Sequence, residues 1–334
     1  MAHTHIIGQT GTGKTTLLLH ALLQNISYTY KRLNRNRYNG VCFIDPDGAA
    51  IDLFLEHIPK RRRRHVVVFD PTQSVNWNPL TDRLAVSLVD DLAAVNRYEI
   101  SANLFYETGL YTFLVFQEAG LNIGEVVAFL KDKKTRTKVL SKISDPFLQF
   151  HWQQFDKLSD RDQDAATRSF KTTFSILLAD ERVRKMFRKQ ESSFTIEPET
   201  IFLARLPVAE LGEKPVGMIG TLLLGQLHAT GLPLYVDSCD LFAHTTLRKI
   251  LQRGDSSLTV THQTLDQLDP RLKTALLGNA AHRHVFRVSI RDADELERMT
   301  EDNNTDPALF ELEPFVYRTF PRLKREDDYV EALR

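Results

Sequence analysis

Eight residues near the start of the sequence match a pattern that binds phosphate groups. Gly8-Gln9-Thr10-Gly11-Thr12-Gly13-Lys14-Thr15 fits G-x-x-x-x-G-K-[ST] without a gap. The glycines let the backbone turn sharply and approach an anion closely, so that successive N–H groups can point at a phosphate. Lys14 would bring a positive charge to the β and γ phosphates, and the Thr15 hydroxyl would bind Mg²⁺. The predicted nucleotide-binding set is Gly8, Gln9, Thr10, Gly11, Thr12, Gly13, Lys14, Thr15 and Thr16.

The segments on either side of this loop favour the same interpretation. "THII" before the loop indicates a short strand, and "KTTLLLHALLQN" after it indicates an apolar helix. The positive end of the helix dipole would strengthen an anion site. The alternative is an ordinary Gly- and Thr-rich turn before a helix. The loop alone does not identify the work that a bound nucleotide would drive.

A site that hydrolyses a nucleotide needs further groups at the ends of neighbouring strands. Asp237 follows the apolar run "PLYV" and would hold Mg²⁺ with Thr15, although an aspartate there could also be a turn or cap residue. Gln263 ends the run "LTVTHQ", where it could contact a γ-phosphate or bond only to the backbone. Arg253 could reach the site of a neighbouring subunit or lie on the surface. We expect Lys14, Asp237, Gln263 and Arg253 to be catalytic.

Strand-like and helix-like segments alternate through most of the remaining sequence. Strands are expected at 40–48, 65–71, 200–207, 232–237, 256–263 and 284–289. Residues 79 to about 195 show helical periodicity with few strand signals, and "DADELERMTE" indicates a later helix with Asp292 as its N-cap. These patterns predict an α/β fold, a mostly parallel sheet with helices on both faces and an all-helical insertion.

The same patterns predict the domain organisation. The core is expected to be discontinuous, formed by residues 1–78 and 196–305, with the helical insertion at 79–195 and a charged tail at 306–334. The length of 334 residues suits one large domain with an insertion, or two domains.

The composition is that of a globular protein, with 42% hydrophobic and 26% charged residues. Basic and acidic residues balance at 43 each, so that any contact with DNA must come from a local patch or from assembly. No apolar run approaches the roughly 20 residues of a membrane span. Cys42 and Cys239 are expected to be buried free thiols, and "HTH" at 3–5 could bind a metal only weakly. We expect a cytoplasmic protein without a membrane span of its own.

Several segments in a fixed order resemble the HerA/FtsK clan of DNA-pumping ATPases, and most closely the coupling-protein motors of type IV secretion and conjugation. The segments are "IIGQTGTGKTTLL", "FIDPDGAAID", "VVVFDPTQSVNWNPL", "RLPVAELGEKPVGMIGTLLLGQL", "LYVDSCDLF", "LTVTHQTLDQL" and "FRVSIRDADEL". The resemblance covers about residues 5 to 300 and implies a RecA-like P-loop motor core that binds ATP and Mg²⁺. It also implies a homo-hexameric ring with nucleotide between subunits and DNA in the central pore.

Residue by residue, the resemblance assigns Lys14 and Thr15 to the phosphate and Mg²⁺, Asp237 to the metal, and Gln263 to the sensor. Arg253 lies in the region that supplies an arginine finger. The sequence departs from the family pattern in two places. The segment before Ile6 has no room for membrane helices or a small barrel, which indicates a motor core that relies on a partner for any membrane anchor, or a fragment. Ser238 stands where the family has a glutamate that polarises the attacking water.

A serine cannot act as a general base near neutral pH without another activating group. We therefore expect Asp240 to supply the missing carboxylate, because it shares the face of Ser238 if the strand continues. Asp47 is the second choice; with Asp45 it closes the second strand of the core, which is expected beside the strand of Asp237.

Two functions of different classes remain at this point. The first is an ATP-dependent DNA translocase that contacts the DNA backbone, with a membrane-anchored or DNA-processing partner. The second is a nucleotide-binding but hydrolytically weak subunit that structures or regulates a DNA-transfer assembly, and a pump for protein or another polymer is a further possibility. The Arg61–Arg64 run and "KDKKTRTK" (131–138) could contact DNA or simply be solvated.

Overall fold

The computed structural model describes residues 2–27, 29–32, 35–81, 83–95, 102–298, 309–313 and 316–321. Most of the predicted tail, 306–334, therefore lies outside the described residues. Internal contacts divide the chain into two compact units. The first unit comprises Met1–Phe69, Ile196–Glu210 and Leu227–Arg334, and the second comprises Asp70–Thr195 and Leu211–Gln226. We keep the discontinuous core with a helical insertion as our proposal for the domains.

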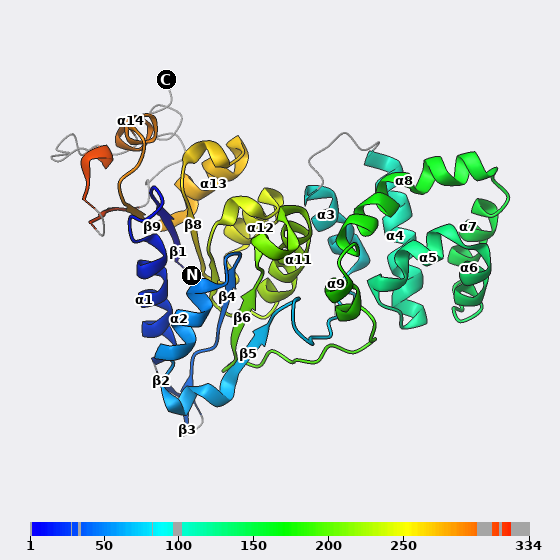
Figure 1. The fold of residues 1–334 in the computed structure, drawn as a ribbon, viewed down its shortest axis with the longest axis horizontal. Coiled ribbons are helices and arrows are strands. Elements are labelled where there is room, and N and C mark those ends of the chain that lie inside the picture. The colour runs from blue at the N-terminus through cyan, green and yellow to red at the C-terminus, as the bar shows by residue number, and fades with distance from the viewer. Residues whose placement is uncertain are drawn as a thin grey trace. The chain divides into compact units, whose positions relative to one another are not determined.

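The first unit is built on an eight-stranded sheet in the order β10-β9-β1-β8-β7-β4-β6-β5 (Figure 1). The strands are β1 (His3–Ile7), β4 (Val41–Asp45), β5 (Val66–Phe69), β6 (Ile201–Arg205), β7 (Leu234–Val236), β8 (Leu258–His262), β9 (Ala280–Val285) and β10 (Arg318–Pro321). All neighbouring pairs are parallel except β9 and β10. This confirms the predicted mostly parallel sheet of a RecA-like fold. A separate pair, β2 (Thr29–Arg32) and β3 (Arg35–Tyr38), was not predicted.

Helices cover both faces of this sheet, as the alternation of buried residues along β1 demonstrates. Ile6 belongs to the core formed with α1 (Lys14–Ser27) and α2 (Ala49–His57). Ile7 belongs to a second core, formed with α13 (Pro270–Asn279) and α14 (Ile290–Arg298). Because successive side chains of a strand point to opposite faces, the two helix pairs pack on opposite sides. Every residue of β4 is buried, as the apolar run Val41–Ile44 before Asp45 leads one to expect.

Two further α-helices of the first unit each begin after the carboxyl-terminal end of a strand. They are α10 (Val208–Leu211) after β6 and α12 (His244–Arg253) after β7. The predicted cap of α14 is wrong, because the helix begins at Ile290 and Asp292 lies in its first turn. Ser289 caps it instead, since its hydroxyl accepts a hydrogen bond of 3.1 Å from the N–H of Asp292. Both cysteines are buried and free, as predicted.

Helices are the regular secondary structure of the second unit's described residues, joined by turns and irregular segments such as 70–81 and 187–195. It contains α3 (Ala85–Val95), α4 (Ala102–Ala119), α5 (Val126–Lys131), α6 (Lys133–Leu140), α7 (Pro146–Phe155), α8 (Asp160–Leu177), α9 (Glu181–Met186) and most of α11 (Glu213–His228). Its core is aromatic: Phe113 packs edge-on against Phe170, and Phe129 against Trp152. None of the described helices is both long and apolar enough to traverse a bilayer.

Candidate nucleotide site

The phosphate-binding loop leaves the sheet at the end of β1, between β8 and β9. It is fixed to both neighbours, because the N–H of Gly8 donates to the carbonyl of His262 at 3.4 Å and that of Gln9 to the carbonyl of Arg287 at 2.8 Å. A Cβ on Gly8 would lie 2.6 Å from the Cβ of Phe286, so only glycine fits there. Gly13 has a φ of 110°, which a side chain would strain. The loop geometry thus explains the spacing of the motif.

Lys14 begins α1 and is half-buried within the loop. Its Nζ donates a 3.0 Å hydrogen bond to the carbonyl oxygen of Gln9. Burial lowers the pKa of Lys14, while the carboxylates of Asp237 and Asp240 partly oppose that shift. A phosphate placed against the loop would offer this ammonium group a charged partner in place of a carbonyl.

Thr15 and Asp237 meet although 222 positions separate them in the sequence. The Thr15 hydroxyl donates to Asp237 Oδ2 at 3.0 Å. Asp237 follows β7, and its Oδ1 accepts from the N–H of Ser238 at 3.0 Å and from the Thr261 hydroxyl. A hydroxyl and a carboxylate so placed are oxygen ligands of the kind that Mg²⁺ takes together with water and phosphate. Across the described residues, no cluster of three or more His, Cys, Asp or Glu side chains suggests another metal site.

Ser238 marks a sharp change in the backbone after β7. It has φ 49° and ψ 56°, the left-handed region, and among the described residues it is the one non-glycine residue with positive φ. The strand therefore does not continue to Asp240; β7 ends at Val236 and Cys239–Leu241 forms a 3₁₀ turn. The face-sharing argument for Asp240 is wrong for this reason.

Asp240 nevertheless lies close enough to the loop for its charge to raise the pKa of Lys14. Its Oδ2 accepts a 3.0 Å hydrogen bond from Nε2 of Gln267. The Oε1 of Gln267 in turn accepts from the N–H groups of Gln263 and Thr264, both at 2.9 Å. Gln267 was missed by the sequence analysis, although "TLDQ" (264–267) fits the capping-box pattern that places such a glutamine.

Gln263 follows β8, directly beside the loop, because His262 is in register with Ile7. Its side chain is exposed, and within the described part of the chain the hydrogen bond of this residue outside regular secondary structure is that of its backbone N–H to Oε1 of Gln267. A sensor role therefore stays a prediction, but its position next to the phosphate loop is the one that the role requires.

A buried histidine pair lies in the two strands next to the loop, His5 in β1 and His262 at the end of β8. Nε2 of His5 lies 2.6 Å from Nε2 of His262, and the two rings are stacked. Nδ1 of His262 donates to the carbonyl of Thr264 at 2.9 Å, so that its Nε2 must accept and His5 must donate. Nδ1 of His5 is then left without a hydrogen-bond partner. Burial, reinforced by the charge of Lys14, lowers the pKa of His262 to about 4.

The "HTH" segment therefore serves the sheet rather than a metal. Its other histidine, His3, accepts through Nδ1 a 3.1 Å hydrogen bond from the N–H of Leu258. Both histidines are buried among β1, β8 and their neighbours, where polar groups need partners.

The strand of Asp45 lies beside the strand of Asp237, as expected, with Ile44 in register with Val236. Asp45 is buried, and its carboxylate accepts from the N–H groups of Asp47 at 2.9 Å and Ile51 at 3.1 Å. Burial raises its pKa, and the nearby charge of Asp237 acts in the same direction. Asp45 is thus occupied in holding the start of α2, while Asp47 is exposed.

Arg253 is the exposed last residue of α12 and precedes the start of β8. The parallel strands have their amino-terminal ends on that side of the sheet, whereas the phosphate loop lies at their carboxyl-terminal ends. Arg253 is therefore not brought to the site of its own chain, and a finger role would require a neighbouring subunit.

Two of the basic residues considered as DNA contacts face the protein interior. Arg62 is buried, and it donates to the carbonyl groups of Asn39 at 2.7 Å and Glu199 at 3.2 Å. Arg136, in the second unit, is buried against Asp156 and donates to the carbonyl of Phe129 at 2.9 Å. These two arginines stabilise the fold, which leaves only their exposed neighbours to bind a ligand.

Comparison with protein-family models finds no match, and neither does comparison with curated protein sequences. Solved structures do match. An unbound form of the bacterial conjugative coupling protein TrwB aligns with a TM-score of 0.63 at 13% identity, over 97% of this chain and 82% of that one. TrwB in complex with ADP and Mg²⁺ gives 0.63 at 13% identity, over 97% and 83%. VirB4 of Thermoanaerobacter pseudethanolicus gives 0.60 at 14% identity, over 98% and 91%. The chain therefore has the RecA-like P-loop fold of the conjugative coupling protein TrwB and of VirB4.

Proposed function

We propose that the chain is an ATP-dependent DNA translocase of the kind that serves conjugation and type IV secretion. The observation that carries this proposal is the contact between Thr15 and Asp237, 3.0 Å apart at the mouth of the phosphate loop. It joins the two halves of a nucleotide site from distant parts of the sequence. The fold likeness to TrwB, whose structures include complexes with ADP and Mg²⁺ and with a non-hydrolysable ATP analogue, supports the same ligands here.

Each residue of the site has a task in this proposal. The backbone N–H groups of the loop bind the phosphates, and Lys14 leaves the carbonyl of Gln9 to pair with their oxygens. Thr15 and Asp237 hold Mg²⁺, which when bound neutralises charge that develops on the phosphate oxygens. Gln263 lies where it can contact the terminal phosphate from the end of β8.

We assign activation of the attacking water to Asp240. It is half-buried, near Lys14, and oriented by Nε2 of Gln267. Among the three alternatives, Asp45 is occupied by backbone N–H groups and Asp47 is exposed, whereas Ser238 lacks a carboxylate. Arg253 lies at the amino-terminal ends of the strands, away from the phosphate loop of its own chain. This position is consistent with a contact to the nucleotide of a neighbouring subunit in a homo-hexameric ring.

The alternative is a nucleotide-binding subunit with weak hydrolysis that structures or regulates a DNA-transfer assembly. The observation in its favour is Ser238, which stands in a left-handed turn beside Asp237 with no acidic side chain of its own. Under either function we expect DNA contacts mainly to the backbone, weakened by salt. We also expect a cytoplasmic location and a membrane-anchored or DNA-processing partner.

ATP turnover with and without DNA separates the two functions. We would compare the wild type with Lys14→Ala, Asp240→Ala and Ser238→Glu, after confirming that each variant folds. The translocase proposal predicts DNA-stimulated turnover that falls on Lys14→Ala and on Asp240→Ala. A wild type that binds ATP but turns over no faster than Lys14→Ala would refute it. If turnover then appears in Ser238→Glu, the alternative is supported; full activity in Asp240→Ala would refute only the assignment of Asp240.

A further inference from the structure

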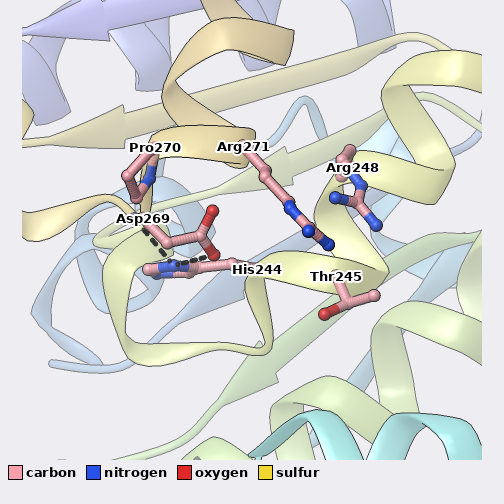
Figure 2. Close-up of a pocket in the computed structure, with 6 residues that line it drawn as sticks. All are labelled: His244, Thr245, Arg248, Asp269, Pro270 and Arg271. Atoms are coloured by element: carbon pink, nitrogen blue, oxygen red, sulfur yellow. Dashed lines mark hydrogen bonds and ion pairs between the residues drawn. The ribbon is translucent and has the colours of Figure 1, made fainter.

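A cavity of about 390 Å³ lies between the first turns of α12, which follows β7, and α13, which follows β8. Its lining residues are His244, Thr245, Arg248, Asp269, Pro270 and Arg271 (Figure 2). In Figure 2 the guanidinium groups of Arg248 and Arg271 are directed into the same space, next to Thr245. Two cationic side chains thus face one cavity from two different helices.

Neither arginine is neutralised within the described part of the chain. No salt bridge or side-chain hydrogen bond joins Arg248 or Arg271 to another described residue. The one carboxylate of the lining, Asp269, is engaged elsewhere: its Oδ1 accepts from the N–H of Leu272 at 2.8 Å, and its Oδ2 lies 2.9 Å from Nδ1 of His244. The cavity therefore carries an excess of positive charge.

The backbone adds to this charge. The ten-residue helices α12 and α13 both begin at the cavity, so that the positive ends of their dipoles point toward it. Ala243 caps α12 without a side-chain hydrogen bond, whereas Asp269 caps α13. Together with a planar guanidinium pair, these features fit a phosphate group, which accepts bidentate hydrogen bonds from arginine.

We propose that Arg248 and Arg271 bind a phosphodiester group of a nucleic-acid strand in this cavity. The inference deepens the proposed function and rests on it. The cavity is open, and both Arg271 and Thr245 are exposed, so that a single free anion would remain well solvated and weakly held. A strand overcomes this weakness because each phosphate adds a further contact and releases counterions.

Two loops of the protein link the cavity to the nucleotide site, so that a nucleic-acid strand bound in the cavity can affect that site. The loop after β7 and the loop after β8 are joined twice. On the nucleotide side Asp240 bonds to Gln267 at 3.0 Å, and on the cavity side His244 bonds to Asp269 at 2.9 Å. A phosphate that draws the first turns of α12 and α13 together would therefore shift the loop that carries Asp240. DNA binding and ATP hydrolysis are coupled through these two loops.

The test measures binding of a fluorescently labelled oligonucleotide, single- and double-stranded, to the full chain over a range of salt. The variant is Arg248→Gln with Arg271→Gln. The control, Arg161→Gln with Arg298→Gln, makes the same change of charge at two exposed arginines that are not among the lining residues of the cavity. We expect the variant to lose roughly tenfold or more in affinity at low salt, and its salt slope to fall by about one, because the contact to one phosphate is lost. ATP affinity and thermal midpoint should match the control.

Four outcomes are distinguishable. Weaker oligonucleotide binding in the variant but not in the control supports the site. Equal binding by variant and control overturns it while leaving the proposed function intact. Failure of the wild type to bind either oligonucleotide refutes the proposed function and this inference with it. If inorganic phosphate protects the cavity arginines from a guanidinium-modifying reagent but the oligonucleotide does not, the cavity binds free anions and the strand assignment is overturned.

Discussion

The buried pair of His5 and His262 makes the stability of the sheet depend on pH in a defined direction. The two rings share one hydrogen bond in their neutral forms, and burial lowers the pKa of His262 from 6.5 to about 4. The unfolded chain therefore takes up a proton at a higher pH than the folded chain does. The stabilisation is complete above pH 6.5 and is lost progressively as the pH falls toward 4. The lowered pKa of His5 acts in the same direction.

The size of the effect follows from the two values of the pKa. The difference between 6.5 and about 4 corresponds to about 3 kcal/mol of unfolding free energy for His262. About 2 kcal/mol of this should be gone by pH 5. In His262→Asn the amide can still donate to the carbonyl of Thr264, but the N–H of His5 loses its acceptor. We expect this variant to be less stable at pH 8 by about 1–3 kcal/mol.

The assay is urea unfolding followed by circular dichroism at several pH values. Acidification protonates His262 in the wild type and so lowers its stability, whereas His262→Asn has no imidazole at this position. The difference in unfolding free energy between the two proteins should therefore narrow by about 2 kcal/mol from pH 8 to pH 5. His20→Asn, at an exposed position on α1, serves as the control and should run parallel to the wild type. If the difference in unfolding free energy between the wild type and His262→Asn is the same at pH 8 and pH 5, His262 is not a neutral, buried imidazole with a lowered pKa, and the reasoning fails.

Three further predictions concern other parts of the site and fold. Gly8→Ala should weaken ATP binding by about tenfold or more, because its Cβ has no room in the loop, whereas Gly278→Ala, in open space on α13, should not; nucleotide titration compares them. Arg136→Gln should destabilise the fold by about 3–5 kcal/mol by leaving a carboxylate partner unpaired, and should leave DNA affinity unchanged; a fall in DNA affinity without loss of stability would contradict this. Arg253→Ala and Lys14→Ala, each inactive alone, should regain roughly a quarter of the turnover when mixed, since a head-to-tail ring supplies the arginine from a neighbour; no regain would exclude a finger at this position.

The sequence predicted the parts of the site that local patterns determine. The phosphate loop follows from residue spacing, and its helix and strand follow from the apolar runs beside it. Asp237 was predicted because parallel strands end at one edge of a sheet, and the structure places it against Thr15. The mostly parallel sheet was likewise predicted from the alternation of strands and helices.

Other contacts depend on pairings that no local pattern encodes. His5 and His262 lie 257 positions apart, and only the register between β1 and β8 brings them together. The burial of Arg62 and Arg136 depends on the carbonyl groups and the carboxylate that surround them, so that both were considered with the exposed basic residues. The turn at Ser238 ended the strand earlier than the apolar pattern indicated, which changed how Asp240 reaches the site.

The most direct test of the central proposal is displacement of streptavidin from biotinylated DNA ends by the purified chain with ATP and Mg²⁺. The experiment uses single- and double-stranded DNA in parallel, since either could be the track. The proposal predicts displacement from at least one of them by the wild type, and none by Lys14→Ala or with a non-hydrolysable ATP analogue. A wild type that binds both ATP and DNA but displaces streptavidin from neither DNA would contradict the account.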